Sequence, residues 1–251
     1  MYAGKGAVLF ILSEFLLSVE AYRGALEIAR QIGDRHREAE ALSQIGFGFF
    51  FAHEFEKALE YAEQARELTL TIGSKDILPG SMHVIGLVHG VTGRPGKAAP
   101  LWSEAVKISR EEGNKSLEGI NLTMLGQFHN WRGEYEQALR LHEQTCTIGQ
   151  VHNLQEVLLQ SVFPRSIAYC AKGEYEQALI SLQEALGKSE QLGDQYFKCR
   201  GLNTLGRVYG ELYNLDLAIR YNRDGKMDKK IKGKLLAHSL CSLCNRWFLT
   251  L

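Results

Sequence analysis

The stretch GEYEQAL at residues 133–139 recurs letter for letter at residues 173–179, 40 positions further along the chain. The same step of 40 connects two ladders of small residues without an insertion. The alanine ladder comprises Ala58, Ala98, Ala138, Ala178 and Ala218. The glycine ladder comprises Gly46, Gly86, Gly126 and Gly206, with Ser166 in the gap. Such a register predicts a solenoid of stacked units, each too small to bury its own apolar face.

A second set of glycines marks where helices are expected to end. It consists of Gly33, Gly73, Gly113 and Gly193, with Asn153 in the missing place, and of Gly133 and Gly173. Glycine and asparagine tolerate the left-handed backbone conformation at which many helices end. Between these stops the apolar spacing is helical, and no alternation of period two indicates a strand. Asp34 and Asp194 each follow a glycine stop and are expected to cap the next helix.

Each unit is therefore expected to hold two helices, A and B. The predicted A helices span residues 35–51, 76–91, 115–131, 155–171 and 195–211. The predicted B helices span residues 15–31, 54–71, 95–111, 134–150, 174–191 and 214–227. The glycine ladder lies inside the A helices, where glycine costs about 1 kcal/mol relative to alanine. We expect this cost to be tolerated because helices approach closely there, with the alanine ladder of the B helices as the matching surface.

The pattern is broken in one A helix. Pro164 predicts a kink there, although drift in a tolerant repeat explains it as well. Arg165 follows Pro164. The equivalent positions of the other units are aliphatic and are occupied by Ile45, Ile85, Leu125 and Leu205.

Composition narrows the possible functions. The 251 residues are 45% hydrophobic and 23% charged, with 29 basic residues balancing 29 acidic ones. This composition is typical of a globular chain, and the absence of a basic excess argues against nucleic acid as a partner. No uninterrupted run of 18 apolar residues predicts a membrane span. Five cysteines without framework spacing favour reduced thiols and a cytoplasmic location.

Both ends of the chain allow alternatives. Residues 7–12 resemble the apolar core of a signal peptide, but Gly6 and Phe15 lie 40 residues before Gly46 and Phe55, which favours a worn first repeat. Residues 226–251 comprise a basic segment and an apolar stretch, which would be a capping helix or a frayed tail. The pair Cys241 and Cys244 in this tail is a C-x-x-C, for which we weigh a metal or redox site against ordinary packing thiols.

The glycine of helix A, a ring three residues after it and the alanine of helix B resemble the tetratricopeptide repeat (TPR). The match is carried by residues 125–129 with 133–139, by residues 205–209 with 215–219, and by residues 25–34. A 40-residue unit is similar to the longer repeats of bacterial and cyanobacterial signalling proteins and kinesin light chains. The resemblance implies an all-α, right-handed α-solenoid of antiparallel helix pairs, the TPR superhelix, with about five to six repeats. We place the array at residues 1–225, with repeats at 1–33, 34–73, 74–113, 114–153, 154–193 and 194–225.

The resemblance also implies a binding surface, because A helices in this family line a concave groove that holds a peptide or partner segment. The corresponding positions here are Gln44, Phe47, Phe50, His83, Met124, Gln127, Trp131, Arg200, Asn203 and Arg207. Only the group of Arg200, Asn203 and Arg207 is similar to the carboxylate clamp of the chaperone-binding members, and the paired Lys and Asn positions are absent. Phe47 and Phe50 are either anchors for a partner or core residues.

We therefore expect a non-catalytic protein–protein interaction scaffold that binds a protein or peptide, without metal, cofactor, nucleic acid or membrane. A second hypothesis is a sensory or regulatory module that binds an effector or peptide and is a fragment of a larger signalling protein. An enzyme is disfavoured because the sequence holds no nucleophile–base grouping, phosphate loop or metal-ligand spacing. The sequence specifies no oligomeric state.

Overall fold

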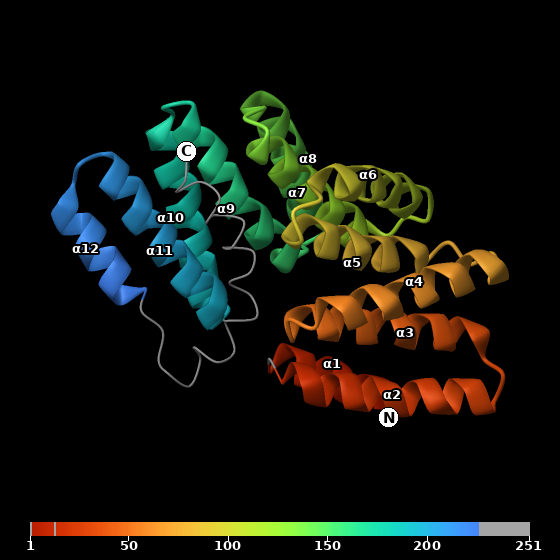
Figure 1. Cartoon of the computed structure of the whole chain (residues 1–251). Coiled ribbons are helices and arrows are strands. Elements are labelled where there is room, and N and C mark those ends of the chain that lie inside the picture. Colours follow the sequence, from red (N-terminus) through yellow and green to blue (C-terminus); the bar gives the residue numbers. More distant parts are fainter. Residues whose placement is uncertain (1, 13, 226–251) are drawn as a thin grey trace. The chain divides into compact units, whose positions relative to one another are not determined.

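Helices follow one another throughout the described part of this computed structural model, which comprises residues 2–12 and 14–225 (Figure 1). The helices are α1 (Tyr2–Ile11), α2 (Phe15–Gln31), α3 (Arg35–Phe51), α4 (Phe55–Ile72), α5 (Leu78–Val91), α6 (Pro95–Glu111), α7 (Lys115–Trp131), α8 (Tyr135–Val151), α9 (Gln155–Ala171), α10 (Tyr175–Gln191), α11 (Gln195–Glu211) and α12 (Leu215–Asp224). No strand occurs among these residues. The expected all-α solenoid of helix pairs is therefore confirmed.

Most helix boundaries agree with the glycine stops. The A helices α3, α7, α9 and α11 begin and end at the predicted residues, and so do the B helices α2 and α6. Helix α5 begins two residues late, with Pro79 in its first turn, where a missing N–H costs no hydrogen bond. Helix α9 is one continuous helix despite Pro164. The predicted tail at 226–251, with Cys241 and Cys244, lies outside the described residues, and the division into six repeats stays a prediction.

The local chemistry of the helix ends is also as expected. The predicted glycines all have positive φ angles, between 67° and 77°, and Asn153 has a φ of 54°. The carboxylates of Asp34 and Asp194 each accept a hydrogen bond of 3.0 Å from the backbone three residues later. His53 and Tyr213 adopt the same left-handed conformation. Each lies two steps of 40 residues from Gly133. The left-handed turn is therefore also formed at equivalent positions that have no glycine.

The described residues form two compact units, one over residues 2–117 and one over residues 118–225. In the first unit each helix from α1 to α6 packs against its neighbours in sequence, and the A helices α3 and α5 also touch. The second unit repeats this arrangement from α8 to α12, with contact between α9 and α11. Nearest-neighbour packing of this kind is what a solenoid of helix pairs requires.

The glycine ladder makes close contacts, but its partners differ from those expected. A Cβ atom on Gly46 would lie 3.1 Å from the carbonyl oxygen of Ala58 and from the backbone nitrogen of Ala62. Only this glycine meets the alanine ladder. The other three face larger side chains, which belong to Trp102 at Gly86, His142 at Gly126 and Asn222 at Gly206. Each filling residue lies 16 positions after its glycine, so the glycines serve to accommodate a side chain of variable size from the facing B helix.

The alanine ladder has a different role in the core. Ala58, Ala98, Ala138 and Ala178 have no exposed surface at all, and Ala218 is also buried. These alanines therefore bury the start of each B helix, while the residue one turn later fills the space left by the glycine.

Candidate partner-binding site

The ten predicted groove residues fall into the two units and are described unit by unit. Gln44, Phe47, Phe50 and His83 lie on the A helices α3 and α5 of the first unit. Met124, Gln127 and Trp131 lie on α7, and Arg200, Asn203 and Arg207 lie on α11 of the second unit.

In the first unit the predicted anchors are packed among other rings. Phe47 stacks on Phe10 of α1, with ring centroids 5.0 Å apart, and meets Phe51 edge to face at 4.8 Å. Phe50 is only 4% exposed and packs against Phe51 at 5.4 Å. His83 is buried, and its ring centroid lies 6.2 Å from that of Phe47. Edge and offset ring pairs of this kind stabilise a core, so the packing favours the core interpretation of Phe47 and Phe50.

Gln44 lies on the same helix and is only partly buried. It is the one predicted residue of α3 whose polar side chain keeps some access to solvent.

On α7 the three predicted residues are half-buried. The indole nitrogen of Trp131 is buried and has no hydrogen-bond acceptor among the described residues. Next to it, the side-chain amide of Asn130 donates a 2.7 Å hydrogen bond to the carbonyl oxygen of Pro164 in α9. This buried bond ties α7 to α9 at the proline, and the sequence reasoning had no signal for it.

On α11 the predicted residues form a polar strip, which we call the α11 strip: Arg200, Asn203 and Arg207. The Arg200 guanidinium lies over the ring of Phe163 in α9, 4.5 Å from its centroid. The Asn203 amide donates a 3.3 Å hydrogen bond to the carbonyl oxygen of Gly225. Arg207 is 40% exposed, and its Nε is 4.0 Å from the Glu211 carboxylate. That distance is too long for a hydrogen bond, and the buried Nε has no hydrogen-bond acceptor among the described residues.

The geometry of the α11 strip suits carboxylates. Arg200 and Arg207 are seven residues apart, which is about two helical turns, or about 10 Å along the axis. Their side chains therefore leave the helix on nearly the same side. A guanidinium presents a planar fork of donors that fits a carboxylate, and such charge-assisted hydrogen bonds are stronger than neutral ones. The strip thus offers two carboxylate-binding groups with an amide between them.

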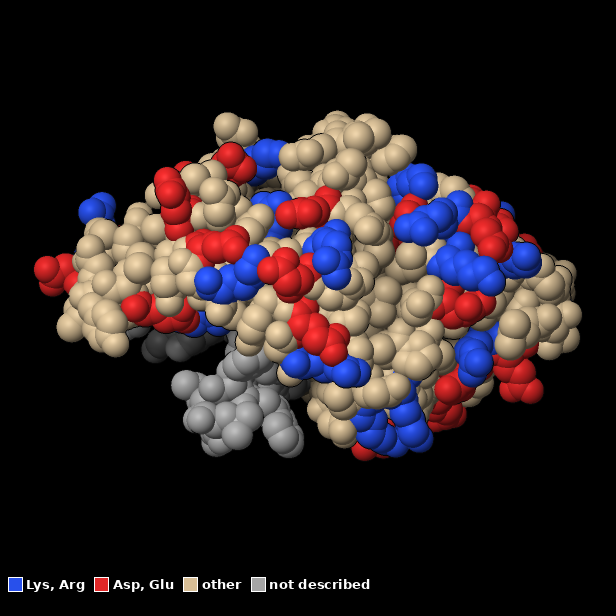
Figure 2. Space-filling view, turned by 90° about the horizontal axis from the view of Figure 1, so that it is seen from above, with Lys and Arg blue, Asp and Glu red and all other residues tan. Residues whose placement is uncertain are grey.

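Elsewhere the surface charges are mixed. Figure 2 shows Lys and Arg side chains interspersed with Asp and Glu on the face that it draws. Many form short-range pairs, such as Arg23 with Glu20 at 2.8 Å and Lys57 with Glu54 at 2.8 Å. Exposed pairs of this kind contribute at most about 1 kcal/mol each to stability. A charged partner would therefore be recognised by a few particular side chains and not by a large patch of one charge.

Neither a metal site nor a membrane span occurs among the described residues. Residues 2–12 and 14–225 contain no group of three or more His, Cys, Asp or Glu side chains placed to hold a metal ion. Within the same residues, no helix has the length and apolar character needed to cross a membrane. The cysteines in this part of the chain, Cys146, Cys170 and Cys199, are buried and free.

Comparisons with known proteins agree with this architecture. A family model described as "Tetratricopeptide repeat" matches residues 1–70, and another with the same description matches residues 122–153.

Several solved structures are similar to the chain. A Rap protein in complex with competence and sporulation factor has 17% identity and a TM-score of 0.74, with 94% of this chain and 74% of that chain covered. NprR in complex with its cognate peptide NprX has 16% identity and a TM-score of 0.67, with 100% and 73% covered. A putative kinesin light chain from Podosopora anserina, with nearly identical TPR-like repeats, has 17% identity and a TM-score of 0.58, with 74% and 92% covered. At these identities the likeness concerns the fold.

Proposed function

We propose that this chain, which is a tetratricopeptide-repeat protein, is a non-catalytic binding module that holds an acidic segment of a partner protein or peptide. The proposed contact is the α11 strip. The observation that carries the proposal is the pair of arginines two turns apart on one A helix, of which Arg207 is bound to its own helix only at 4.0 Å. The Phe47 and Phe50 rings do not enter the proposal, because other rings cover them.

The spacing of the strip defines the partner more closely. A polyproline II segment rises about 3.1 Å per residue and has three residues per turn. Residues i and i+3 of such a segment therefore lie on one side, about 9 Å apart, which nearly matches the distance of about 10 Å between the two arginines along α11. We propose an extended segment with two acidic side chains three residues apart, one on each guanidinium, and with the Asn203 amide between them.

A peptide-sensing module within a larger signalling protein is the second proposal. It is supported by the likeness to the Rap protein and NprR, both solved in complex with peptides. Sensing differs from scaffolding in requiring a change of conformation on binding. Hydrogen exchange of the second unit, with and without a bound peptide, distinguishes the two. Protection beyond the contact residues supports sensing, and protection limited to α9 and α11 supports a scaffold.

The Arg207→Glu variant is expected to lose affinity for the acidic peptide while keeping its fold. Reversing the charge removes a charge-assisted pair and adds a repulsion, so we expect the dissociation constant to rise at least about tenfold. Fluorescence polarisation with a labelled proline-rich peptide that carries Glu at i and i+3 measures this effect. The same peptide with Gln at both positions tests the charge of the ligand.

Arg220→Glu is the matched control. Arg220 is an exposed arginine on α12, 3.9 Å from Asp224. It should change the affinity by less than about twofold, because Arg220 is exposed on another helix and its charge is screened by salt. Equal binding by the native protein, Arg207→Glu and Arg220→Glu would contradict the proposed site. A lower melting temperature in Arg207→Glu with unchanged affinity would make Arg207 a structural residue.

A further inference from the structure

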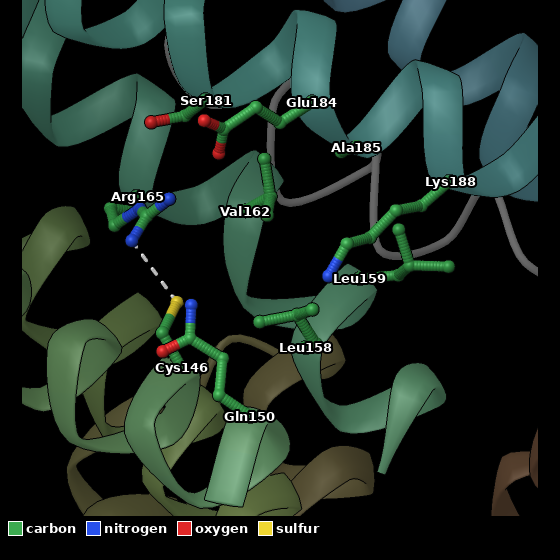
Figure 3. A pocket seen from close by; sticks show the side chains of 10 residues that line it. All are labelled: Cys146, Gln150, Leu158, Leu159, Val162, Arg165, Ser181, Glu184, Ala185 and Lys188. Carbon is green, nitrogen blue, oxygen red and sulfur yellow. Dashed lines mark hydrogen bonds between the residues drawn. The ribbon is translucent and has the colours of Figure 1, made fainter. Parts of the chain in front are cut away.

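A pocket in the second unit lies apart from the α11 strip, among α8, α9 and α10 (Figure 3). Its polar lining comes from Cys146, Gln150, Arg165, Ser181, Glu184 and Lys188. Its apolar lining includes Leu158 and Val162 of α9 and Ala185 of α10. The cavity volume is about 40 Å³, which is more than the roughly 10–15 Å³ that one water molecule needs. The space therefore suits a small chemical group and excludes a nucleotide or a sugar.

The unusual member of this lining is Arg165. In the other units its position is aliphatic, as with Ile45 and Leu205, which are fully buried. One terminal nitrogen of Arg165 donates to the Cys146 sulfur at 3.1 Å, the dashed line in Figure 3. Its Nε is buried without an acceptor among the described residues. Arg165 is half-buried, and a buried donor that remains unpaired is unfavourable. An anion that accepts a hydrogen bond from the guanidinium would remove this cost and compensate the charge.

The charged side chains around the pocket do not compensate the positive charge of Arg165. Neither Arg165 nor Lys188 forms an ion pair with any carboxylate in residues 2–12 and 14–225, although Glu184 also lines the pocket. Arg165 and Lys188 together outnumber Glu184 by one charge. One additional negative charge would neutralise the pocket, whereas a doubly charged phosphate would reverse its sign. Burial, together with the charge of Arg165, lowers the pKa of His142.

We infer that this pocket binds a monocarboxylate carried on a short aliphatic group. The carboxylate would sit between Arg165 and Lys188, and the aliphatic part would lie against Leu158 and Val162. The Gln150 amide and the Ser181 hydroxyl are the neutral hydrogen-bonding groups of the same lining. Two sources share this chemistry, the C-terminus of a peptide that ends in an aliphatic residue and a free aliphatic acid. The inference does not depend on the α11 strip, whose residues take no part in it.

The test compares acids with their amides. Isovalerate and isovaleramide represent the free acid, and acetyl-Ala-Ala-Leu with its C-terminal amide represents the peptide terminus. Ligand-observed NMR titrations of the native full chain give the dissociation constants. We expect each acid to bind at least about tenfold more tightly than its amide, because a hydrogen bond to a charged group is worth this factor or more. The peptide acid binding more tightly than isovalerate identifies a peptide terminus, and equal affinities identify a free acid.

Arg165→Leu restores the aliphatic residue of the other units. It should raise the dissociation constants of both acids at least about tenfold. Its melting temperature should stay the same or rise, because a half-buried side chain with an unpaired Nε is replaced by an apolar one. Lys188→Gln provides a second variant in case Arg165→Leu fails to fold. It should raise the dissociation constants of the acids severalfold.

Arg140→Leu is the matched control. It removes an exposed arginine of α8 that hydrogen-bonds only to Gln137, and it should leave the affinities unchanged. Equal binding of acids and amides by the native protein would overturn the inference. So would native-like affinity in both Arg165→Leu and Lys188→Gln.

Discussion

Replacing Gly126 by alanine is expected to destabilise the second unit although alanine is the better helix former. A Cβ atom on Gly126 would lie 2.7 Å from Nε2 of His142, which is too close for two non-bonded atoms. The His142 ring is completely buried, so it has no open space into which to move. Overpacking of this kind costs about 1–3 kcal/mol. Urea denaturation followed by circular dichroism measures the change in the free energy of unfolding.

Gly187→Ala is the matched control for this substitution. Gly187 also lies inside a helix of the second unit, α10, but a Cβ atom there would meet nothing within 4 Å. This variant should be more stable by about 0.5–1 kcal/mol, because alanine restricts the unfolded chain and favours the helix. The double variant Gly126→Ala, His142→Ala should lose less stability than the two single changes together. If Gly126→Ala were as stable as Gly187→Ala, the proposed contact with His142 would be wrong.

The second large effect is a loss of stability in acid that depends on His142. Burial and the charge of Arg165 lower the pKa of His142 from 6.5 to about 3 in the folded protein. Both ring nitrogens lack a hydrogen-bond partner among the described residues. The unfolded chain therefore binds a proton at higher pH than the folded chain does. Between pH 6.5 and about 3, this group alone lowers the free energy of unfolding by up to about 1.4 kcal/mol for each pH unit of acidification.

His142→Leu isolates this contribution. The equivalent residue 40 positions later is Leu182, which is fully buried in an apolar cluster of the second unit, so leucine is compatible with the site. The variant should be at least as stable at pH 7 and should have a shallower pH dependence than the native protein. Urea midpoints at pH 7, 6, 5 and 4 measure both. His152→Leu, at an exposed histidine on the end of α8, should keep the native slope. A native slope in His142→Leu would remove His142 as the cause.

The sequence predicts those features that depend on residues close to one another along the chain. Gly33 and Gly113 end helices because a left-handed residue is required there, and a single position carries that information. Asp34 caps α3 for an equally local reason. The 40-residue period then extends each local prediction to the corresponding place in the other units. The boundaries of α3, α7, α9 and α11 follow from these signals alone.

Contacts between helices were much less predictable. The sequence allows Phe47 to be either a partner anchor or a core residue. The core interpretation is favoured by Phe10 of α1, which stacks on it from a segment whose repeat pattern is worn. The expected partner from the alanine ladder is wrong for Gly86, Gly126 and Gly206. The facing residue belongs to a column at Ala62, Trp102, His142, Leu182 and Asn222 whose chemistry varies freely. A search for conserved residue types passes over such a column, although its regular spacing of 40 was visible.

Arg165 was noticed as a break in the pattern, yet the pocket around it comes from three helices. Its pairing with Cys146 joins residues 19 apart on α8 and α9. The charge balance of the pocket depends on side chains of α10 as well, and only the folded arrangement brings them together.

The glycine and its filling residue bear on how such a chain changes over generations. Substitution of the glycine brings a Cβ atom into the facing side chain, at an energetic cost. Duplication of a whole 40-residue unit copies both residues together, so the new unit arrives already fitted. Substitution of the glycine is therefore resisted while lengthening by entire units is tolerated. The facing position is less constrained, because side chains as different as those of Trp102 and Asn222 occupy it opposite the same glycine.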